Sequence, residues 1–156
     1  MSDQLRRLEQ WVAPLLAKLT PAERRKLAGR IARDLRRRQQ QRIITQRNPD
    51  GSPFEPRKPQ SRQQRGRIRR LPMFMKIRRA AHLRTKGQPN AAEVGFVGRI
   101  AQIARVHHYG LRDRVRPGGP DYQYPSRELL GYSDADLRMI SDTLIDHLTP
   151  EGRARP

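Results

Sequence analysis

Apolar residues recur at alternating spacings of three and four positions through the first twenty residues of the chain. The stripe comprises Leu5, Leu8, Val12, Leu15 and Leu19. This period predicts a helix with one apolar face, from about residue 3 to residue 19. Pro14 lies inside the segment, and because proline removes a backbone donor, we expect a kinked helix or two short helical pieces.

A second helix is predicted to begin at Pro21 and to extend to about Thr45. Thr20 and Glu23 have the spacing of a capping box, and proline suits the first helical position. Most of the helix surface is Arg and Gln, so its apolar stripe is narrow and needs a partner. We therefore expect a helical hairpin with the first segment, and packing between subunits along the same stripe. The candidate subunit-packing residues are Leu27, Ile31 and Leu35.

The middle of the chain combines turn residues with a run of positive charge. Residues 48–51 read Asn-Pro-Asp-Gly, which predicts a tight turn, and the prolines that follow favour extended backbone. Residues 57–70 carry seven Lys and Arg and a single aliphatic side chain. Because such a composition cannot bury a core, we expect a basic loop that is mobile in the free protein and ordered in an assembly.

Shorter elements are predicted in the second half of the chain. Pro72 favours a short apolar helix at residues 73–77. Alternation of side chains predicts strands at residues 82–86 and 92–97 around a turn. Residues 111–123 are polar and are expected to be a loop.

Two further helices are predicted in this half. The first spans residues 99–109 and ends at Gly110, a typical C-terminal glycine. Its apolar face comprises Ile100, Ile103, Ala104 and His107. The second begins with a capping box between Ser133 and Asp136. Its buried stripe comprises Leu137, Ile140, Leu144 and Leu148.

These elements predict one structural domain of the α+β class. It has an N-terminal helical hairpin with a long basic helix, a small antiparallel β-sheet and two further helices. Along the sequence the hairpin covers residues 1–45, and the Pro-rich turn and basic loop cover residues 46–72. A small α+β core follows at residues 73–150, and residues 151–156 are expected to form a disordered tail.

Charge adds information about partners. The 156 residues include 34 Lys and Arg against 15 Asp and Glu, a formal net charge of +19. Between residues 21 and 70 the count is 17 basic and 4 acidic residues. A field of this sign attracts phosphates, anionic membranes or acidic protein surfaces. The sequence contains no cysteine, which excludes disulfides and thiolate metal sites, and its apolar runs fall far short of the ~20 residues of a membrane span.

The candidate catalytic and metal-binding residues favour structural roles. His107 and His108 are adjacent, and neighbours on a helix point about 100° apart, so they are poorly placed to share a metal that needs three or four ligands. We expect His107 to lie on the core face and to bond a backbone group. Asp134 and Asp136 suit the start of a helix. With no nucleophile motif and no phosphate-binding loop, we expect a protein that is not an enzyme and needs no metal or cofactor.

Three interpretations of the basic stretch remain open. It binds nucleic acid, it docks onto an acidic protein, or it is a solvated face. Aromatic residues make up 5% of the chain and none lies between Phe54 and Phe74, which weighs against base stacking by the loop. Charge alone supplies salt-sensitive affinity without sequence recognition.

Five strings along the chain are more specific than its composition. They are residues 19–29 (LTPAERRKLAG), 38–59 (RQQQRIITQRNPDGSPFEPRKP), 66–70 with 73–77, 104–114 (ARVHHYGLRDR) and 124–136 (YPSRELLGYSDAD). In this order they resemble the phage virion-morphogenesis family of tail-completion proteins from contractile-tailed temperate phages. The chain departs mildly from the family at His108, where a glutamine or a similar residue is typical, and at Ser126, where an alanine is typical.

The resemblance implies a structural protein that completes the head-proximal end of a tail and supports head–tail joining in the neck. Such proteins are not known as enzymes, and related neck and tail-completion proteins form rings, often sixfold. The implied partners are further copies of the chain and neighbouring tail tube, terminator, sheath or neck proteins. Packaged DNA is a further implied contact, and a membrane is not. The implied location is the tail–neck region of the virion, with the host cytoplasm during assembly.

The resemblance also marks residues for docking onto such partners. The candidates are Arg57, Lys58, Arg65, Arg67, Arg69, Arg70, His107, Tyr109, Tyr124 and Arg127. For the residues outside the basic loop, internal packing is the alternative role. The alternative function for the whole chain is independent, nonspecific nucleic-acid binding, which the salt dependence of DNA binding would distinguish.

Overall fold

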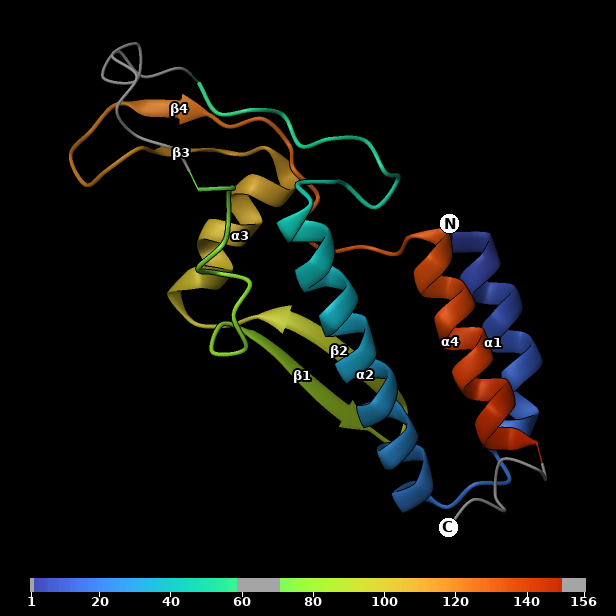
Figure 1. Ribbon diagram of the computed structural model, residues 1–156. Coiled ribbons are helices and arrows are strands. Elements are labelled where there is room, and N and C mark those ends of the chain that lie inside the picture. Colours follow the sequence, from blue (N-terminus) through green and yellow to red (C-terminus); the bar gives the residue numbers. More distant parts are fainter. Residues whose placement is uncertain (1, 59–70, 150–156) are drawn as a thin grey trace. The chain divides into compact units, whose positions relative to one another are not determined.

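A computed structural model describes residues 2–58 and 71–149 of the chain. These ranges form α1 (Ser2–Leu16), α2 (Pro21–Ile44), β1 (Leu83–Gln88), β2 (Ala91–Phe96), α3 (Arg99–Tyr109), β3 (Arg112–Arg114), β4 (Asp121–Gln123) and α4 (Asp134–Leu148) (Figure 1). The strands pair as two antiparallel hairpins, β1 with β2 and β3 with β4. The predicted α+β class is therefore confirmed. Most of the predicted basic loop and the predicted tail lie outside the described residues.

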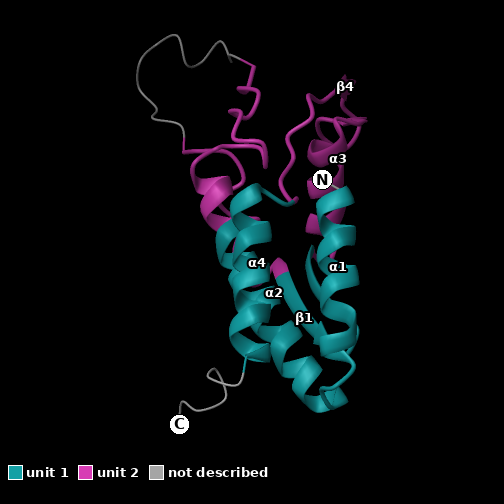
Figure 2. Cartoon of the chain, turned by 90° about the vertical axis from the view of Figure 1, so that its right-hand side faces the viewer, with its two compact units in different colours: residues 1–38, 84–95, 132–156 teal, residues 39–83, 96–131 magenta. Residues whose placement is uncertain are grey.

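The chain divides into two compact units (Figure 2). Unit 1 combines Met1–Arg38, Arg84–Gly95 and Tyr132–Pro156. Unit 2 combines Gln39–Leu83 and Phe96–Gly131. Each unit thus brings together segments that are far apart in the sequence, and α2 contributes residues to both.

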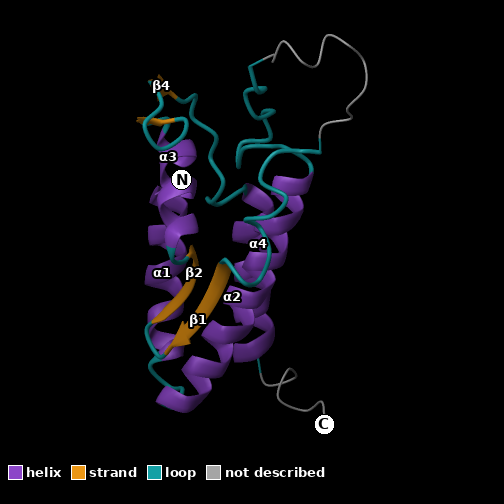
Figure 3. Cartoon of the chain, turned by 90° about the vertical axis from the view of Figure 1, so that its left-hand side faces the viewer, coloured by secondary structure: helices purple, strands orange, loops and turns teal. Residues whose placement is uncertain are grey.

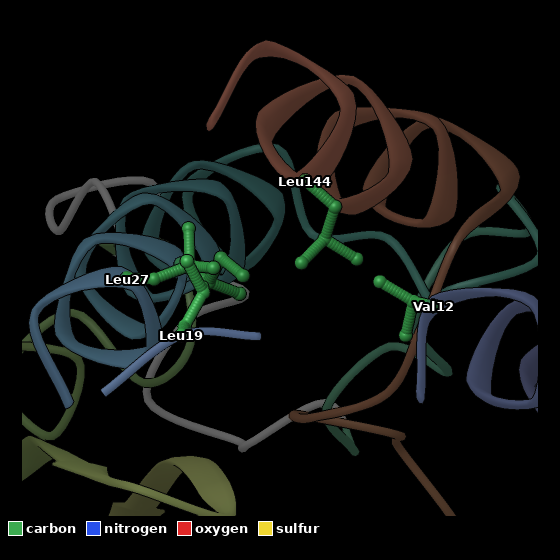
Figure 4. Packing of buried hydrophobic residues seen from close by; sticks show 5 residues of the cluster. Val12, Leu19, Leu27 and Leu144 are labelled. Atoms are coloured by element: carbon green, nitrogen blue, oxygen red, sulfur yellow. The ribbon is translucent and has the colours of Figure 1, made fainter. Parts of the chain in front are cut away.

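The core of unit 1 joins three helices. Leu144 of α4 faces Val12 of α1, and Leu27 of α2 lies with Leu19 opposite them (Figure 4). Together with Ile31 these side chains form one buried cluster. Members of all three predicted stripes pack in this cluster, although Leu5 and Leu15 are not among its residues. The first helix also lies beside α4 (Figure 1), a pairing that the sequence does not predict.

Helix α1 is a single helix that includes Pro14, so the alternative of two separate pieces is wrong. The helix ends at Leu16, which places the proline in its last turn. There the missing N–H leaves the Gln10 carbonyl without its helical bond, and only two helical residues follow the proline. Immediately afterwards the backbone N–H of Ala17 donates to the carbonyl of Ala13 at 3.0 Å.

Three predicted helix boundaries are confirmed in detail, whereas α1 ends at Leu16 instead of about residue 19. The backbone N–H of Thr20 donates to the Glu23 carboxylate at 2.8 Å, and that of Glu23 donates to the Thr20 hydroxyl at 3.2 Å. Ser133 and Asp136 form the same reciprocal box at the start of α4. Gly110 ends α3 in the left-handed conformation, with φ of 63°.

The hairpin of β1 and β2 lies against α2 in unit 1 (Figure 3). A β carbon at Gly87 would lie 2.5 Å from the Gly29 nitrogen and 2.9 Å from the carbonyl oxygen of Arg25. Side chains essentially never approach a backbone so closely, so this strand packs directly on the helix because Gly87 has none.

Unit 2 has a core of its own. Its buried cluster comprises Phe54, Met73, Ile77, Ala104 and Leu129.

The predicted turn at residues 48–51 is confirmed, since the N–H of Gly51 donates to the carbonyl of Asn48 at 3.0 Å. On α3 the predicted apolar face is partly wrong, because Ile103 is 46% exposed whereas Val106 is buried.

Two predictions about the backbone of unit 2 are wrong. Residues 73–77 form turns instead of a helix, since Phe74 has a left-handed φ of 66°. The amide side chain of Gln46 bonds both the N–H and the carbonyl of Met73, each at 2.9 Å, in place of helical bonds. Residues 111–123 are a hairpin rather than a loop, with Arg112 opposite Gln123.

Candidate partner-docking site

The side chain of Arg127 is buried in unit 2, with the residue 4% exposed. Its Nε donates to the Glu55 carbonyl at 2.6 Å, and one terminal nitrogen donates to the Pro56 carbonyl at 3.2 Å. The other terminal nitrogen lies 3.2 Å from His107 Nδ1. Burial lowers the pKa of Arg127, with the charge of Glu55 opposing that effect, yet arginine stays protonated at neutral pH. A full positive charge is therefore held among neutral acceptors.

His107 is a neutral acceptor for this arginine. Because Arg127 donates to Nδ1, the ring proton resides on Nε2. Burial, together with the positive charges of Arg127 and Arg57, lowers the pKa of His107 to about 4. The expected bond from this side chain to a backbone group is wrong. The ring bonds Arg127, and it is the backbone carbonyl of His107 that accepts from the Arg127 N–H, at 2.7 Å.

Five rings follow one another edge to face in unit 2. In spatial order they are Phe54, Phe74, His107, Tyr124 and Tyr122. Neighbouring centroids are 4.8 to 5.9 Å apart and the planes meet at 69° to 86°, the favourable T-shaped geometry. The Lys58 ammonium lies 4.3 Å from the centroid of Tyr122, a cation–π contact at the end of the row.

A groove of about 390 Å³ opens along this ring row. It is lined by Arg57, Lys58, Met73, Phe74, His107, Val115, Tyr122, Tyr124, Pro125 and Arg127. The lining holds three cations and no carboxylate, within a unit whose sequence has 18 Lys and Arg against five Asp and Glu. Such a groove suits an anionic group that is attached to an apolar one.

The structure brings together five of the residues proposed for docking. Arg57, Lys58, His107, Tyr124 and Arg127 all line the groove. Tyr109 does not line it. Tyr109 is 65% exposed at the end of α3, and the centroid of its ring lies 4.6 Å from that of the His108 ring.

The other proposed residues lie elsewhere. Arg65, Arg67, Arg69 and Arg70 lie outside the described residues. Leu27, Ile31 and Leu35, proposed for subunit packing, are buried in unit 1.

Sequence reasoning missed Phe74, Val115 and Tyr122 as site residues. The alternation of Tyr122 and Tyr124 is a signal that could have been found, since it places both side chains on one face of a strand. Nothing local in the sequence predicts that Phe74 joins them, because its position depends on a left-handed backbone.

Neither a metal centre nor a membrane helix is found in the described residues. Among residues 2–58 and 71–149, no three His, Asp or Glu side chains gather closely enough to hold a metal ion. Every helix of the same ranges is too short or too polar to cross a bilayer.

Comparison with known proteins defines the class. A model of the phage virion morphogenesis family matches residues 3–149. The chain therefore belongs to that family, as the resemblance predicted, and has a structural role in phage virion morphogenesis. Among individual proteins it is similar to "Tail completion protein S" of Escherichia phage P2, with 36% identity over 148 residues. That alignment covers 94% of this chain and 98% of the phage P2 protein. No solved structure matches the chain.

Proposed function

We propose that this protein completes the head-proximal end of a phage tail and supports its joining to the head, as a subunit of a ring in the neck. The observation that carries the proposal is the alignment with the tail completion protein of phage P2, which extends over nearly the full length of both chains. The protein acts by binding its neighbours and catalyses no reaction. It is present in the host cytoplasm during assembly and in the tail–neck region of the virion.

Unit 1 offers a surface for contact between ring subunits. A groove of about 370 Å³ is lined largely by apolar side chains of α1, α2 and the β2 end of the hairpin, including Val12, Leu27 and Ala92. Trp11, on α1, is 51% exposed. Exposed tryptophans are enriched in protein interfaces, where they contribute much of the binding energy. The proposed occupant of this face is a second copy of the chain, with sixfold symmetry in the complete ring.

Deletion of the gene from a phage that carries it tests the role in assembly. Electron microscopy of the lysate is expected to show filled heads and separate tails, and expression of the chain in trans should restore joined particles. Gold-labelled antibody should locate the protein at the head-proximal end of the tail. Joined, infectious particles at normal yield from the deletion strain would contradict the proposal.

The alternative function is independent, nonspecific nucleic-acid binding. The observation in its favour is charge, because unit 2 holds +13 of the net +19 in the sequence. The dissociation constant for double-stranded DNA, measured for the pure protein over a range of salt, separates the two functions. Weak binding at physiological salt is expected for an assembly protein. Tight binding there, without other virion proteins, would support the alternative.

A further inference from the structure

We propose that the groove along the ring row of unit 2 binds an extended acidic segment of a neighbouring virion protein. Carboxylates of the segment face Arg57, Lys58 and Arg127, and its apolar side chains pack on the wall formed by Phe74, Tyr124 and their neighbours. The proposal rests on the proposed function for the source of the segment, a tail or neck protein of the same particle.

The charge of the groove is the first argument. Arg127 is buried, and its three guanidinium bonds go to two carbonyls and a neutral ring. A guanidinium carries five N–H donors, so two remain without an acceptor among the described residues. Burying a cation whose bonded partners are neutral is costly; the charge of Glu55 offsets part of that cost, and a carboxylate that enters the groove offsets more of it. Arg57 and Lys58, both exposed at the rim, add to the attraction.

The shape of the groove favours an extended chain. A second cavity of about 640 Å³ shares Arg57, Lys58, Tyr122, Tyr124 and Pro125 with the first. It continues between residues 55–58 and residues 122–126. Its lining includes one carboxylate, that of Glu55, so the two cavities together remain net positive. Two adjoining cavities with a shared wall suit a peptide strand with side chains in successive pockets.

The ring row distinguishes a peptide from a nucleic acid. Bases bind to single-strand sites by stacking on open aromatic faces. Here the rings meet edge to face, so an edge of one ring lies against a face of the next. The Lys58 ammonium covers a face of Tyr122. Because these contacts occupy ring faces, the row offers fewer open platforms for bases, while its exposed edges still form an apolar wall for aliphatic side chains.

A random peptide library tests the inference while the partner protein is still unidentified. An mRNA-display library of peptides about twelve residues long, enough for one or two strands, is selected for binding to the immobilised full chain at physiological salt. Peptides rich in Asp or Glu, with interspersed aliphatic residues, are expected to be enriched. The most enriched peptide is then synthesised, and its affinity is measured by fluorescence anisotropy for the wild type and two charge-reversed variants.

The two variants are matched in residue type and in change of charge. Arg57→Glu with Lys58→Glu reverses the rim of the groove, and the affinity is expected to fall about tenfold or more. Arg25→Glu with Lys26→Glu reverses an exposed Arg-Lys pair of unit 1, and a change of less than about threefold is expected. Val115→Ser removes an exposed aliphatic side chain from the groove wall and is expected to weaken binding without changing the charge. Circular dichroism verifies that each variant is folded.

Three results would overturn the inference. One is the absence of any enriched acidic family, and another is an equal loss of affinity in both charge-reversed variants. The third is that single-stranded oligothymidylate displaces the peptide and that its own binding is weakened by the change at Arg57 and Lys58. That result would make the groove a nucleic-acid site. The gene-deletion experiment stays separate. Failure of the selection leaves the assembly role intact, whereas normal particles from the deletion strain overturn that role and not the chemistry of the groove.

Discussion

At the level of single residues, Arg127 connects parts of unit 2 that are distant in the sequence. It bonds the carbonyls of Glu55 and Pro56 through its guanidinium and lies against His107 of α3. Its backbone N–H also donates to the His107 carbonyl. The side chain therefore fixes two sides of the groove at once, in addition to contributing charge to it.

Replacing Arg127 with Gln is expected to lower the free energy of unfolding by roughly 3 kcal/mol, because the buried guanidinium is lost and two carbonyls and a ring nitrogen lose a charged donor. Urea denaturation followed by circular dichroism measures this change. Arg112→Gln, an exposed change in the same unit, is the control and should alter stability by less than about 0.5 kcal/mol. Equal urea midpoints for the two variants would show that the guanidinium bonds do not hold the unit together.

His107 makes stability depend on pH in a defined direction. Its folded pKa of about 4 lies below the ordinary value of 6.5, owing first to burial and then to Arg127 and Arg57, the charged groups that act on it. Between these values the unfolded chain binds more protons than the folded chain, so stability rises with pH. The contribution is complete above about pH 6.5 and is lost as the pH falls toward 4.

His107→Asn keeps an acceptor for Arg127 and removes the titration. We expect the urea midpoint of this variant to vary less with pH between about 4 and 6.5 than that of the wild type. Some slope should remain from His108, whose pKa burial also lowers. Wild-type and variant curves that run parallel across this range would show that His107 is not the titrating group.

The residues of the groove were only partly predictable from the sequence. His107 and Arg127 were identified as docking candidates through the family strings, but Arg127 is one of 34 basic residues and nothing local shows that it is buried. Its burial depends on carbonyls about seventy positions earlier in the chain. Phe74 was missed because its left-handed φ is imposed by its surroundings rather than by its own preference.

At the level of elements, the hairpin of β1 and β2 depends on one close approach to α2. The expected effect of Gly87→Ala is a loss of about 1–3 kcal/mol, because the new methyl group would meet the helix backbone near Gly29 at 2.5 Å. Gly95→Ala in the same hairpin is the control, since a β carbon there meets nothing within 4 Å. Thermal unfolding compares the two. Equal melting temperatures would mean that the hairpin moves away from the helix at little cost.

Elements with strong local signals were predicted well. Capping residues fixed the starts of α2 and α4, and Gly110 fixed the end of α3, since these signals act within one helical turn. The hairpin of β3 and β4 was missed because each strand is three residues long, so that the spacing of Tyr122 and Tyr124 indicates a shared face but does not by itself identify a strand. The predicted helix at residues 73–77 is absent because the Met73 carbonyl, which a helix would pair with the Ile77 N–H, accepts from Gln46, which is distant in the sequence.

At the level of the whole molecule, the proposed ring depends on surfaces that one copy leaves open. Trp11→Ser is expected to raise the concentration needed for self-association about tenfold or more, because an interface loses its large aromatic anchor while the fold of unit 1 keeps its buried core. Light scattering during size-exclusion chromatography measures the mass at several concentrations. Gln10→Ser, at the adjacent exposed position, is the control. If both variants associate like the wild type, the subunit contact lies elsewhere.

The division of the chain between the two units has a consequence for synthesis on the ribosome. Every member of the unit 2 core precedes residue 130, whereas the unit 1 core needs Leu144 of α4. All residues of the unit 2 core are therefore synthesised earlier, whereas the apolar stripes of α1 and α2 remain unpacked until α4 has been synthesised. A nonsense codon ahead of α4 yields a truncated chain in which the apolar stripes of α1 and α2 stay exposed to chaperones and proteases. Completion of unit 1 thus marks the copies that have been translated through α4.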